Sequence, residues 1–402
     1  MGTSSTGSAA LGAIIFDLDG TLVDSNPLQV QGWLATLKDH GYEISKDRIE
    51  VEVGKGGDQL VESVLGKAIE KKDGDSLRQG QTKHARAMIR RDGVRAFDKA
   101  AALLSACRAR GLKVALATSS SAKVQDELLQ AGDIDRSAFD LFVNGDDVKA
   151  TKPQADLYHV TVERLQLSPA ECMNVGDTPY DCIAARKAGL VTIGLSGDLN
   201  DADTLRHGGA RWTVKNVAEL NDRLDEALQI AGPGKVRLTR ERIGQLMQAA
   251  LDQAAAAIDA GEVPIGAVIA NGRGEVIGRG FNRLNATHDK ITHAEIVAFH
   301  AIAGKVDVKA RDLILVSTLE PCVMCMGAAM EAGIDTVLFA LPAPADGGPE
   351  RVTPPISPES QMPRIIGRVL EDRSRSLFEK WLSNHADSEQ AKFVRQLLKA
   401  TA

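Results

Sequence analysis

The first half of the chain alternates short apolar runs with longer stretches in which apolar residues recur at helical spacing. The first run, residues 13–16, ends in acidic residues and glycine, as is typical of a buried strand that delivers side chains to a loop. Later runs repeat this pattern at residues 113–117, 141–143, 173–175 and 190–193. Strands that alternate with helices predict an α/β domain with a doubly wound parallel sheet, in which ligands bind beyond the carboxyl ends of the strands.

A long segment after the first run departs from this alternation. Residues 25–95 consist largely of amphipathic, helix-like sequence, so we expect a helical insert that could act as a lid. Within the insert, residues 53–58 are rich in glycine. They predict either a plain turn or a segment that contacts a substrate.

The second half begins with a different pattern. A stretch rich in alanine and leucine is followed by two strand-like runs, residues 263–270 and 275–278, which flank an Asn-Gly turn. This order predicts a helix and then a β-hairpin. Two further strands are predicted at residues 312–318 and 336–340, with helices between them.

A cluster of glycine and proline at residues 231–235 separates the two patterns, so we place a domain boundary there. A chain of 402 residues is also longer than one hydrophobic core usually extends. Residues 342–363 contain several prolines and glycines and predict a loop whose length suggests a functional edge. We therefore expect a disordered tail at residues 1–11, a first domain at 12–232 with a helical cap at about 25–95, a linker at 233–237 and a second domain at 238–402.

Composition and charge narrow the class of protein. Apolar residues make up 44% of the chain, charged residues 25%, and the formal net charge is −6, all ordinary values for a globular protein. No apolar run approaches the roughly 20 residues of a membrane span. The five cysteines are an odd number and no secretory leader is recognisable, so we expect a reducing, cytoplasmic location.

Two carboxylates stand directly after the first predicted strand. Asp17 and Asp19 are two residues apart, so both side chains can face one site, and Gly20 permits a tight turn. Such a pair can also serve turn formation alone. Taken singly, Thr118 would be a helix N-cap and Lys152 a surface lysine.

Together, however, the polar motifs resemble those of a known family. The sequence DLDGT at residues 17–21, then Thr118, Lys152 and the sequence GDTPYD at residues 176–181 stand in the order of the four motifs of haloacid dehalogenase-like hydrolases. The similarity spans about residues 12–232. The sequence LVDS after the first motif resembles the branch that contains β-phosphoglucomutase and phosphoglycolate phosphatase, and the helical insert stands where that branch has its cap.

This resemblance implies a role for each residue. Asp17 would be the nucleophile that forms an aspartyl phosphate, and Asp19 would protonate the leaving group and then activate water. Thr118 and Lys152 would hold phosphoryl oxygens. The motifs do not separate a phosphatase from a phosphomutase, which uses the same aspartyl phosphate. Magnesium, which prefers carboxylate oxygens, would be bound by Asp17, Asp19, Asp177 and Asp181.

A second chemical motif lies in the other half of the chain. His293 and Glu295 form an H-x-E sequence, and Cys322 and Cys325 follow in a P-C-x-x-C sequence, which is the signature of zinc deaminases. Three zinc ligands, His293, Cys322 and Cys325, leave a fourth position for a water, and Glu295 remains free to transfer protons. A purely structural zinc site would instead close with four protein ligands.

Further residues resemble the cytidine deaminase-like superfamily, in its guanine deaminase and tRNA adenosine deaminase branch. The sequence EVPIGAV at residues 262–268 and the sequence GFNR around Asn282 carry this similarity, which covers about residues 238–341 and then fades. It implies a three-layer α/β/α domain that could form a homodimer. It also implies that Asn282 binds the base and that the backbone at Gly266 and Ala267 lines the pocket.

Two catalytic sets in one chain favour a bifunctional hydrolase. One half would be a magnesium-dependent phosphatase of a small phosphorylated metabolite, and the other a zinc-dependent deaminase of a free nucleobase or nucleoside. We expect small-molecule substrates rather than a nucleic acid, because neither half is basic. For the second half, a tRNA adenosine deaminase remains an alternative, because His288 and Asp289 also resemble that branch. For the first half, a phosphomutase and a catalytically silent domain remain alternatives.

Overall fold

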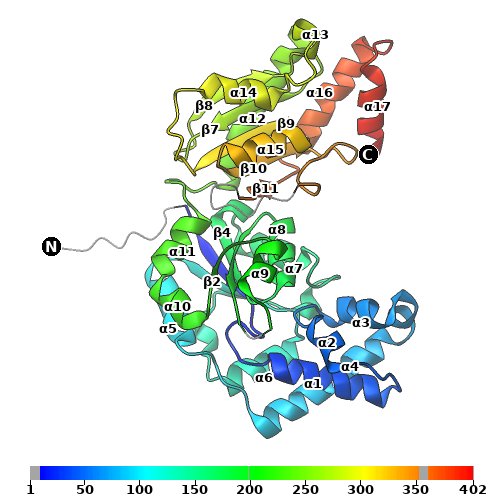
Figure 1. Ribbon diagram of the computed structural model, residues 1–402, viewed down its shortest axis with the longest axis vertical. Helices are drawn as coiled ribbons and strands as arrows, with labels where there is room; N and C mark the ends of the chain where they lie inside the picture. The colour runs from blue at the N-terminus through cyan, green and yellow to red at the C-terminus, as the bar shows by residue number, and fades with distance from the viewer. Residues whose placement is uncertain (1–9, 198, 353–360, 402) are drawn as a thin grey trace, which may run out of the picture. The chain divides into compact units, whose positions relative to one another are not determined.

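The structure is a computed structural model that describes residues 10–197, 199–352 and 361–401 (Figure 1). The described chain divides into two compact units, Leu11–Ala231 and Gly232–Ala402. Each unit has its own sheet and its own hydrophobic core, as independent domains do. Among the described residues, no helix is both long enough and apolar enough to cross a membrane.

Most of the predicted tail, residues 1–11, lies outside the described residues. Its last two residues are described, and both are buried. Leu11 is 1% exposed and belongs to the main core cluster of the first unit. The prediction of a tail is therefore wrong for Ala10 and Leu11, because an apolar side chain next to the first strand gains more from the core than from water.

In its described part, the first unit is built on six parallel strands in the order β3-β2-β1-β4-β5-β6. Ile14 and Phe16 pack in one core cluster and Ala13 and Ile15 in another, because neighbours along a strand point to opposite faces of the sheet. Helices cover both faces, which confirms the predicted doubly wound parallel sheet. The strands are β1 (Ala13–Phe16), β2 (Lys113–Ala117), β3 (Leu141–Val143), β4 (Cys172–Gly176), β5 (Val191–Leu195) and β6 (Ala210–Val214).

Leu103 and Leu104 of α5 pack on one face of this sheet, and Tyr158 of α7 packs on the other. The helices of the sheet layers are α5 (Ala100–Ala109), α6 (Ala122–Ala131), α7 (Asp156–Leu165), α8 (Pro179–Lys187), α9 (Ala202–Gly208), α10 (Val217–Asp222) and α11 (Leu224–Ala231).

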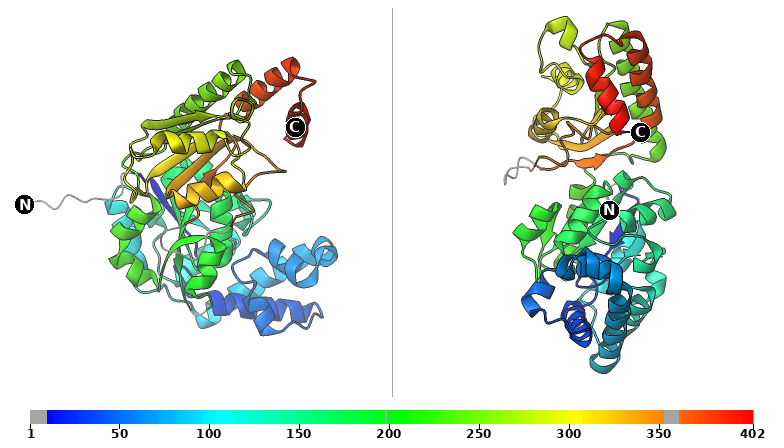
Figure 2. Two further views of the ribbon diagram at one scale, coloured as in Figure 1. Left: turned by 45° about the horizontal axis from the view of Figure 1, so that its top comes forward. Right: turned by 90° about the vertical axis from the view of Figure 1, so that its right-hand side faces the viewer.

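The predicted helical insert is present between β1 and α5. Trp33, Leu37, Leu60 and Leu77 form a small core of their own within it, so the insert is a packed subdomain rather than a loop. Figure 2 shows its helices, in shades of blue, gathered at one end of the first unit. They are α1 (Asn26–Asp39), α2 (Lys46–Glu50), α3 (Gly57–Leu65) and α4 (Lys67–Asp92).

The described part of the second unit contains a mixed sheet of five strands in the order β11-β10-β9-β7-β8. β7 runs antiparallel to β8 and β9, whereas β9, β10 and β11 run parallel. The predicted hairpin and the two later strands are all present, whereas β11 has no counterpart among the predictions. The strands are β7 (Gly266–Ala270), β8 (Val276–Phe281), β9 (Leu313–Leu319), β10 (Ile334–Leu341) and β11 (Arg364–Ile366).

Helices cover both faces of this sheet, which confirms the three-layer arrangement. Gly266 approaches the backbone of α12 on one face, and Ala267 packs with Ala294 of α14 and Met326 of α15 on the other. Of the predicted loop at residues 342–363, residues 353–360 lie outside the described residues. The helices are α12 (Arg240–Asp259), α13 (Leu284–Thr287), α14 (Ala294–Ile302), α15 (Val323–Glu331), α16 (Glu371–Asn384) and α17 (Ala391–Ala400).

Candidate active sites

The carboxyl ends of β1 and β4 hold the first group of functional side chains. Asp17 follows β1, Asp177 follows β4, and these two strands are neighbours. The chain after β1 turns at Gly20, whose φ is +73°. A Cβ atom there would lie 2.1 Å from a carboxylate oxygen of Asp177. Only glycine allows both this backbone conformation and this close approach, so the turn brings the two predicted motifs together.

Three aspartates form a compact set of oxygen ligands. Among the described residues, Asp17, Asp177 and Asp181 each offer a carboxylate oxygen, and these oxygens all lie within 4.8 Å of one another. All three side chains are buried. Such a set suits a hard cation such as Mg²⁺. Asp19 lies outside this set of side-chain oxygens, so its place among the magnesium ligands stays a prediction.

The surroundings of Asp19 explain this difference. Its Oδ1 accepts hydrogen bonds from Ser25 Oγ and Gln29 Nε2, both at 2.7 Å. Its Oδ2 accepts from Ser120 Oγ at 2.8 Å and from Thr118 Oγ1 at 3.4 Å. These neutral donors hold the carboxylate at the wall of a cavity, a placement that suits a proton-transferring group.

Lys152 lies at the centre of this group and is only 1% exposed, so the alternative of a surface lysine is wrong. Its Nζ is 2.5 Å from Asp17 Oδ1 and 2.7 Å from Asp181 Oδ1. Burial lowers the pKa of Lys152, but the two carboxylates outweigh this effect and raise the pKa well above its usual value. The lysine therefore stays a cation, as a buried lysine with carboxylate partners can.

Three buried carboxylates face one lysine, and both burial and their mutual repulsion favour the protonated forms. Burial raises the pKa of Asp17 well above its ordinary range, against the opposing effect of Lys152. Burial and the neighbouring Asp181 raise the pKa of Asp177 to about 7. A divalent cation would relieve this repulsion, so the electrostatics of the site fit the magnesium that the ligand set suggests.

Thr118 follows β2 and is 1% exposed. It does not cap the next helix, because Ser121 is the N-cap of α6. Its hydroxyl instead accepts a hydrogen bond from the backbone N–H of Ser120 at 3.1 Å. Thr118, Asp17 and Asp19 line one side of a cavity of about 1060 Å³, and residues of the insert line the other.

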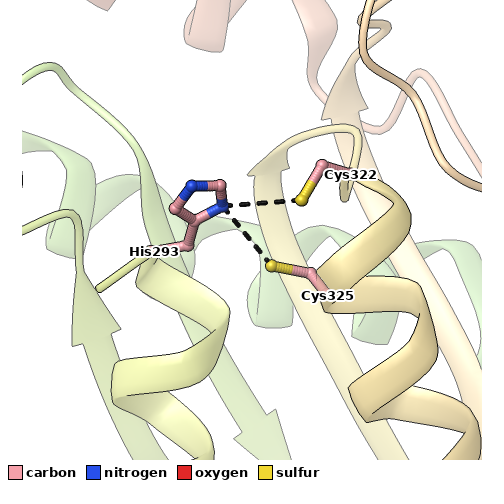
Figure 3. Close-up of side chains that lie close together, drawn as sticks. All are labelled: His293, Cys322 and Cys325. Carbon is pink, nitrogen blue, oxygen red and sulfur yellow. Dashed lines mark hydrogen bonds between the residues drawn. The ribbon is translucent and has the colours of Figure 1, made fainter. Parts of the chain in front are cut away.

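The second group of functional side chains lies where α14 and α15 begin. His293 immediately precedes α14, and Cys322 immediately precedes α15, with Cys325 in its first turn. Figure 3 shows the three side chains converging: His293 Nδ1 is 3.5 Å from Cys322 Sγ and 3.6 Å from Cys325 Sγ. One imidazole and two thiols at this spacing form a set that suits zinc.

Hydrogen bonding prepares this set for a metal. A hydrogen bond from Cys325, with further help from His293, lowers the pKa of Cys322 to about 4 in spite of burial. The same contact and burial raise the pKa of Cys325 above its usual value. The low pKa of Cys322 favours its thiolate, and zinc would displace the proton of Cys325. Glu295 is 3% exposed, burial raises its pKa, and it accepts a hydrogen bond from Ser317 Oγ at 3.0 Å.

The comparisons with known proteins agree with both sites. Residues 14–195 match the family of haloacid dehalogenase-like hydrolases, and residues 240–341 match the cytidine and deoxycytidylate deaminase zinc-binding region. A phosphoglycolate phosphatase from Colwellia psychrerythraea is 30% identical over 214 residues, which cover 52% of this chain and 94% of the relative. The chain is a haloacid dehalogenase-like hydrolase fused to a deaminase-type zinc domain.

Further relatives match the hydrolase unit. A phosphorylated carbohydrates phosphatase from Thermotoga maritima is 28% identical over 210 residues, covering 52% of this chain and 96% of the relative. The crystal structure of a hydrolase from Pseudomonas syringae matches with a TM-score of 0.50 and 26% identity, covering 54% of this chain and 98% of that one. These similarities support the assignment of the first unit to the family.

In the hydrolase unit, the sequence predictions miss the side chains that form hydrogen bonds to Asp177 and Asp181. Thr21 Oγ1 and Asn26 Nδ2 donate to Asp177 at 2.9 and 2.8 Å, and Thr178 Oγ1 donates to Asp181 at 2.6 Å. Thr178 and Asp181 form a capping box at the start of α8, a pattern that is readable from the sequence. Asn26 is not readable in this way, because its role depends on where the insert begins.

In the deaminase unit, Glu262 is the residue that the predictions overlook. Asn282 is 6% exposed, and its Nδ2 donates to Glu262 Oε2 at 3.2 Å. Glu262 is fully buried and also accepts from the backbone N–H groups of Asn285 and Ala286, at 3.1 and 2.8 Å. This contact fixes the orientation of the Asn282 amide, whose carbonyl oxygen can accept a hydrogen bond from a substrate.

Gly266 has a packing role in the structure, and its predicted place in the pocket stays a prediction. A Cβ atom at Gly266 would lie 2.3 Å from the backbone nitrogen of Ala254, so this glycine serves the close packing of β7 on α12. Its own N–H donates to Thr318 Oγ1 at 3.0 Å and is not free for a ligand. Ala267, by contrast, points to the face of the sheet that α14 and α15 cover. It pairs in register with Ser317, the residue that donates a hydrogen bond to Glu295.

Proposed function

We propose that the chain is a bifunctional hydrolase, with a magnesium-dependent phosphatase in the first unit and a zinc-dependent deaminase in the second. The observation that carries this proposal is the presence of two ligand sets of different chemistry. One set is built of carboxylates and the other of thiols and an imidazole. Each lies beside a buried or half-buried carboxylate that can transfer protons, Asp19 in the first and Glu295 in the second.

In the first unit, a carboxylate oxygen of Asp17 would attack the phosphorus and form an aspartyl phosphate. Asp19 would give a proton to the leaving oxygen and later take one from the water that hydrolyses the intermediate. Lys152 and Thr118 would stabilise the negative phosphoryl oxygens. Magnesium, held by Asp17 and the two later aspartates of the ligand set, would supply further neutralisation of charge.

The substrate of the first unit would be a small phosphorylated metabolite. The cavity of about 1060 Å³ opens onto Asp17 and Asp19, so it can hold a leaving group next to the nucleophile. The named relatives are phosphatases of phosphoglycolate and of phosphorylated carbohydrates. Substrates of this size and charge are therefore the first to test.

In the second unit, His293, Cys322 and Cys325 would hold zinc, which activates a water for attack on an amidine carbon. Glu295 would take one proton from that water and give it to a ring nitrogen. It would then take the second proton from the oxygen now bonded to the carbon and give it to the amino group, which leaves as ammonia. The Asn282 carbonyl would accept a hydrogen bond from the base. A free nucleobase or nucleoside would suit this chemistry.

Purified protein supplied with zinc and magnesium would be incubated with bases, nucleosides, their monophosphates, phosphoglycolate, sugar phosphates and tRNA, and the products measured by mass spectrometry. Loss of an amine from a base or nucleoside, together with release of phosphate, would support the proposal. Inosine that appears only in tRNA would replace the second half by an editing deaminase. A rearranged sugar phosphate without free phosphate would replace the first half by a phosphomutase.

A further inference from the structure

The glycine-rich segment of the insert, residues 53–58, lies directly on the core of the hydrolase unit. Gly54 has a φ of +100°, and a Cβ atom there would lie 2.5 Å from the side chain of Thr178. A Cβ atom at Gly56 would lie 1.9 Å from Thr151 Oγ1. The two glycines therefore permit a backbone approach that any larger residue would prevent.

Asp58, at the end of this segment, engages both polar groups that Thr151 can donate. Its Oδ2 accepts from the backbone N–H of Thr151 at 3.2 Å, and its Oδ1 accepts from the Thr151 hydroxyl. Thr151 is 7% exposed, so the contact is shielded from water and its hydrogen bonds to a charged group are strengthened. Asp58 thus clamps one residue of the core from the side of the insert.

The clamped residue directly precedes Lys152, whose Nζ lies between Asp17 and Asp181. The insert also contacts the first turn of α8. Tyr180 donates its hydroxyl to the backbone oxygen of Val51, next to the glycine-rich segment. Through Asp58 and Val51, the insert therefore contacts the chain neighbours of two members of the charged group.

We propose that Asp58 is a positioning residue for the phosphatase: by holding Thr151 it places Lys152 between Asp17 and Asp181 when the insert covers the cavity. This proposal rests on the proposed function of the first unit. A small displacement of a charged group at the reacting centre lowers the rate of the chemical step more than it lowers ground-state binding. Loss of the clamp should therefore reduce kcat for every substrate to a similar degree.

Asp58 also lines the cavity, so a direct contact with the substrate is the competing explanation. A direct contact would depend on the leaving group. Removal of Asp58 would then alter KM for a polar substrate such as phosphoglycolate and leave p-nitrophenyl phosphate nearly unaffected. The two substrates together distinguish positioning from recognition.

The test uses the full chain and four variants of the clamp: Asp58→Ala, Thr151→Val, Thr151→Ser and the double variant Asp58→Ala/Thr151→Val. We expect Asp58→Ala to lower kcat about 10-fold to 100-fold for both substrates with little change in KM. Thr151→Ser keeps the hydroxyl and should restore the wild-type rate. Because both partners belong to one contact, the double variant should be no slower than Asp58→Ala alone. Asp47→Ala, an exposed carboxylate of the same insert, is the control and should not change kcat.

Amide hydrogen exchange of residues 148–152 gives a readout that does not require turnover. Asp58→Ala should speed exchange at the Thr151 amide. If Asp58→Ala does not fold, Asp58→Asn is the milder variant, and we expect the same increase in exchange. Unchanged exchange, a loss confined to phosphoglycolate, or additive losses in the double variant would each overturn the proposal. A wild-type protein that releases no phosphate from any substrate, but in which exchange responds to Asp58, would refute the phosphatase instead.

Discussion

Both candidate sites of this chain bring metal-binding side chains together, but the two sites are assembled from different kinds of structural element. In the hydrolase unit, the charged group comes from separate segments, and Asp17 and Asp177 meet because β1 and β4, which are distant in sequence, are neighbours in the sheet. In the deaminase unit, His293 and Cys322 stand at the starts of two helices that lie close in sequence. Helix N-termini favour thiolate by their dipoles. The geometry of the first site therefore depends on the folding of the whole unit, whereas the geometry of the second depends on the first turns of two helices.

The strongest test of whether the two sites act independently is to remove the proposed nucleophile of the first site alone. Asp17→Asn should lower phosphate release by at least about 1000-fold, because an amide cannot form the aspartyl phosphate. Deamination should remain at the wild-type rate, since Asp17 has no part in the second ligand set. Both rates would be measured on one preparation. Loss of deamination with phosphate release intact would disprove the assignment of the sites.

The reciprocal change is Glu295→Gln. It should lower deamination about 100-fold to 10,000-fold, because glutamine cannot carry the proton to the leaving ammonia. Zinc content should stay at the wild-type level, because Glu295 lies beside the ligands and is not one of them. Zinc would be measured by elemental analysis, with the exposed Glu331→Gln as a matched control. If the variant lost zinc, Glu295 would have to be counted as a ligand.

A smaller effect is expected where a buried carboxylate acts through another residue. Glu262→Gln places an amide where Asn282 and two backbone N–H groups donate, so at least one donor loses its acceptor. A mismatch of this kind costs about 1–3 kcal/mol, and we expect kcat/KM for deamination to fall about 10-fold, mainly through KM. Glu275→Gln changes an exposed turn of the same unit and should leave kcat/KM unchanged. An equal loss in both variants would remove Glu262 from the site.

These residues also show how far the sequence can predict such a molecule. The strands from β1 to β5 are recognisable because they are largely apolar runs, whereas β6 and β11 are not. Arg211 and Thr213 interrupt β6, and β11 has only three residues. The families and most site residues are predictable because their motifs are local. The roles of Asp58 and Glu262 are not, since their partners are 93 and 20 residues away in the sequence and lie outside the local motifs.

Asp19 shows a different kind of limit. Asp17 and Asp19 look equivalent in the sequence, because both are carboxylates at the end of one strand. Only Asp17 joins the ligand set, and Ser25, Gln29 and Ser120 hold Asp19 apart from it. Three neutral donors from two other segments thus separate the Asp19 carboxylate from the ligand set. No spacing rule within the motif contains that information.

The smallest expected effect compares two helix caps. Thr178 caps α8 and Thr239 caps α12, each through its hydroxyl, so either threonine replaced by alanine should cost its unit about 1 kcal/mol of unfolding free energy. Thr178 also donates to Asp181, a member of the carboxylate set, whereas the Thr239 cap serves its helix alone. Thr178→Ala should therefore also weaken magnesium binding, measured by titration calorimetry, and Thr239→Ala should leave both metals at wild-type affinity. If Thr178→Ala lost stability but bound magnesium normally, the three aspartates would keep their geometry without the neighbouring side chain. The contrast between a site that depends on the folding of the whole unit and a site that depends on two helix starts would then fail.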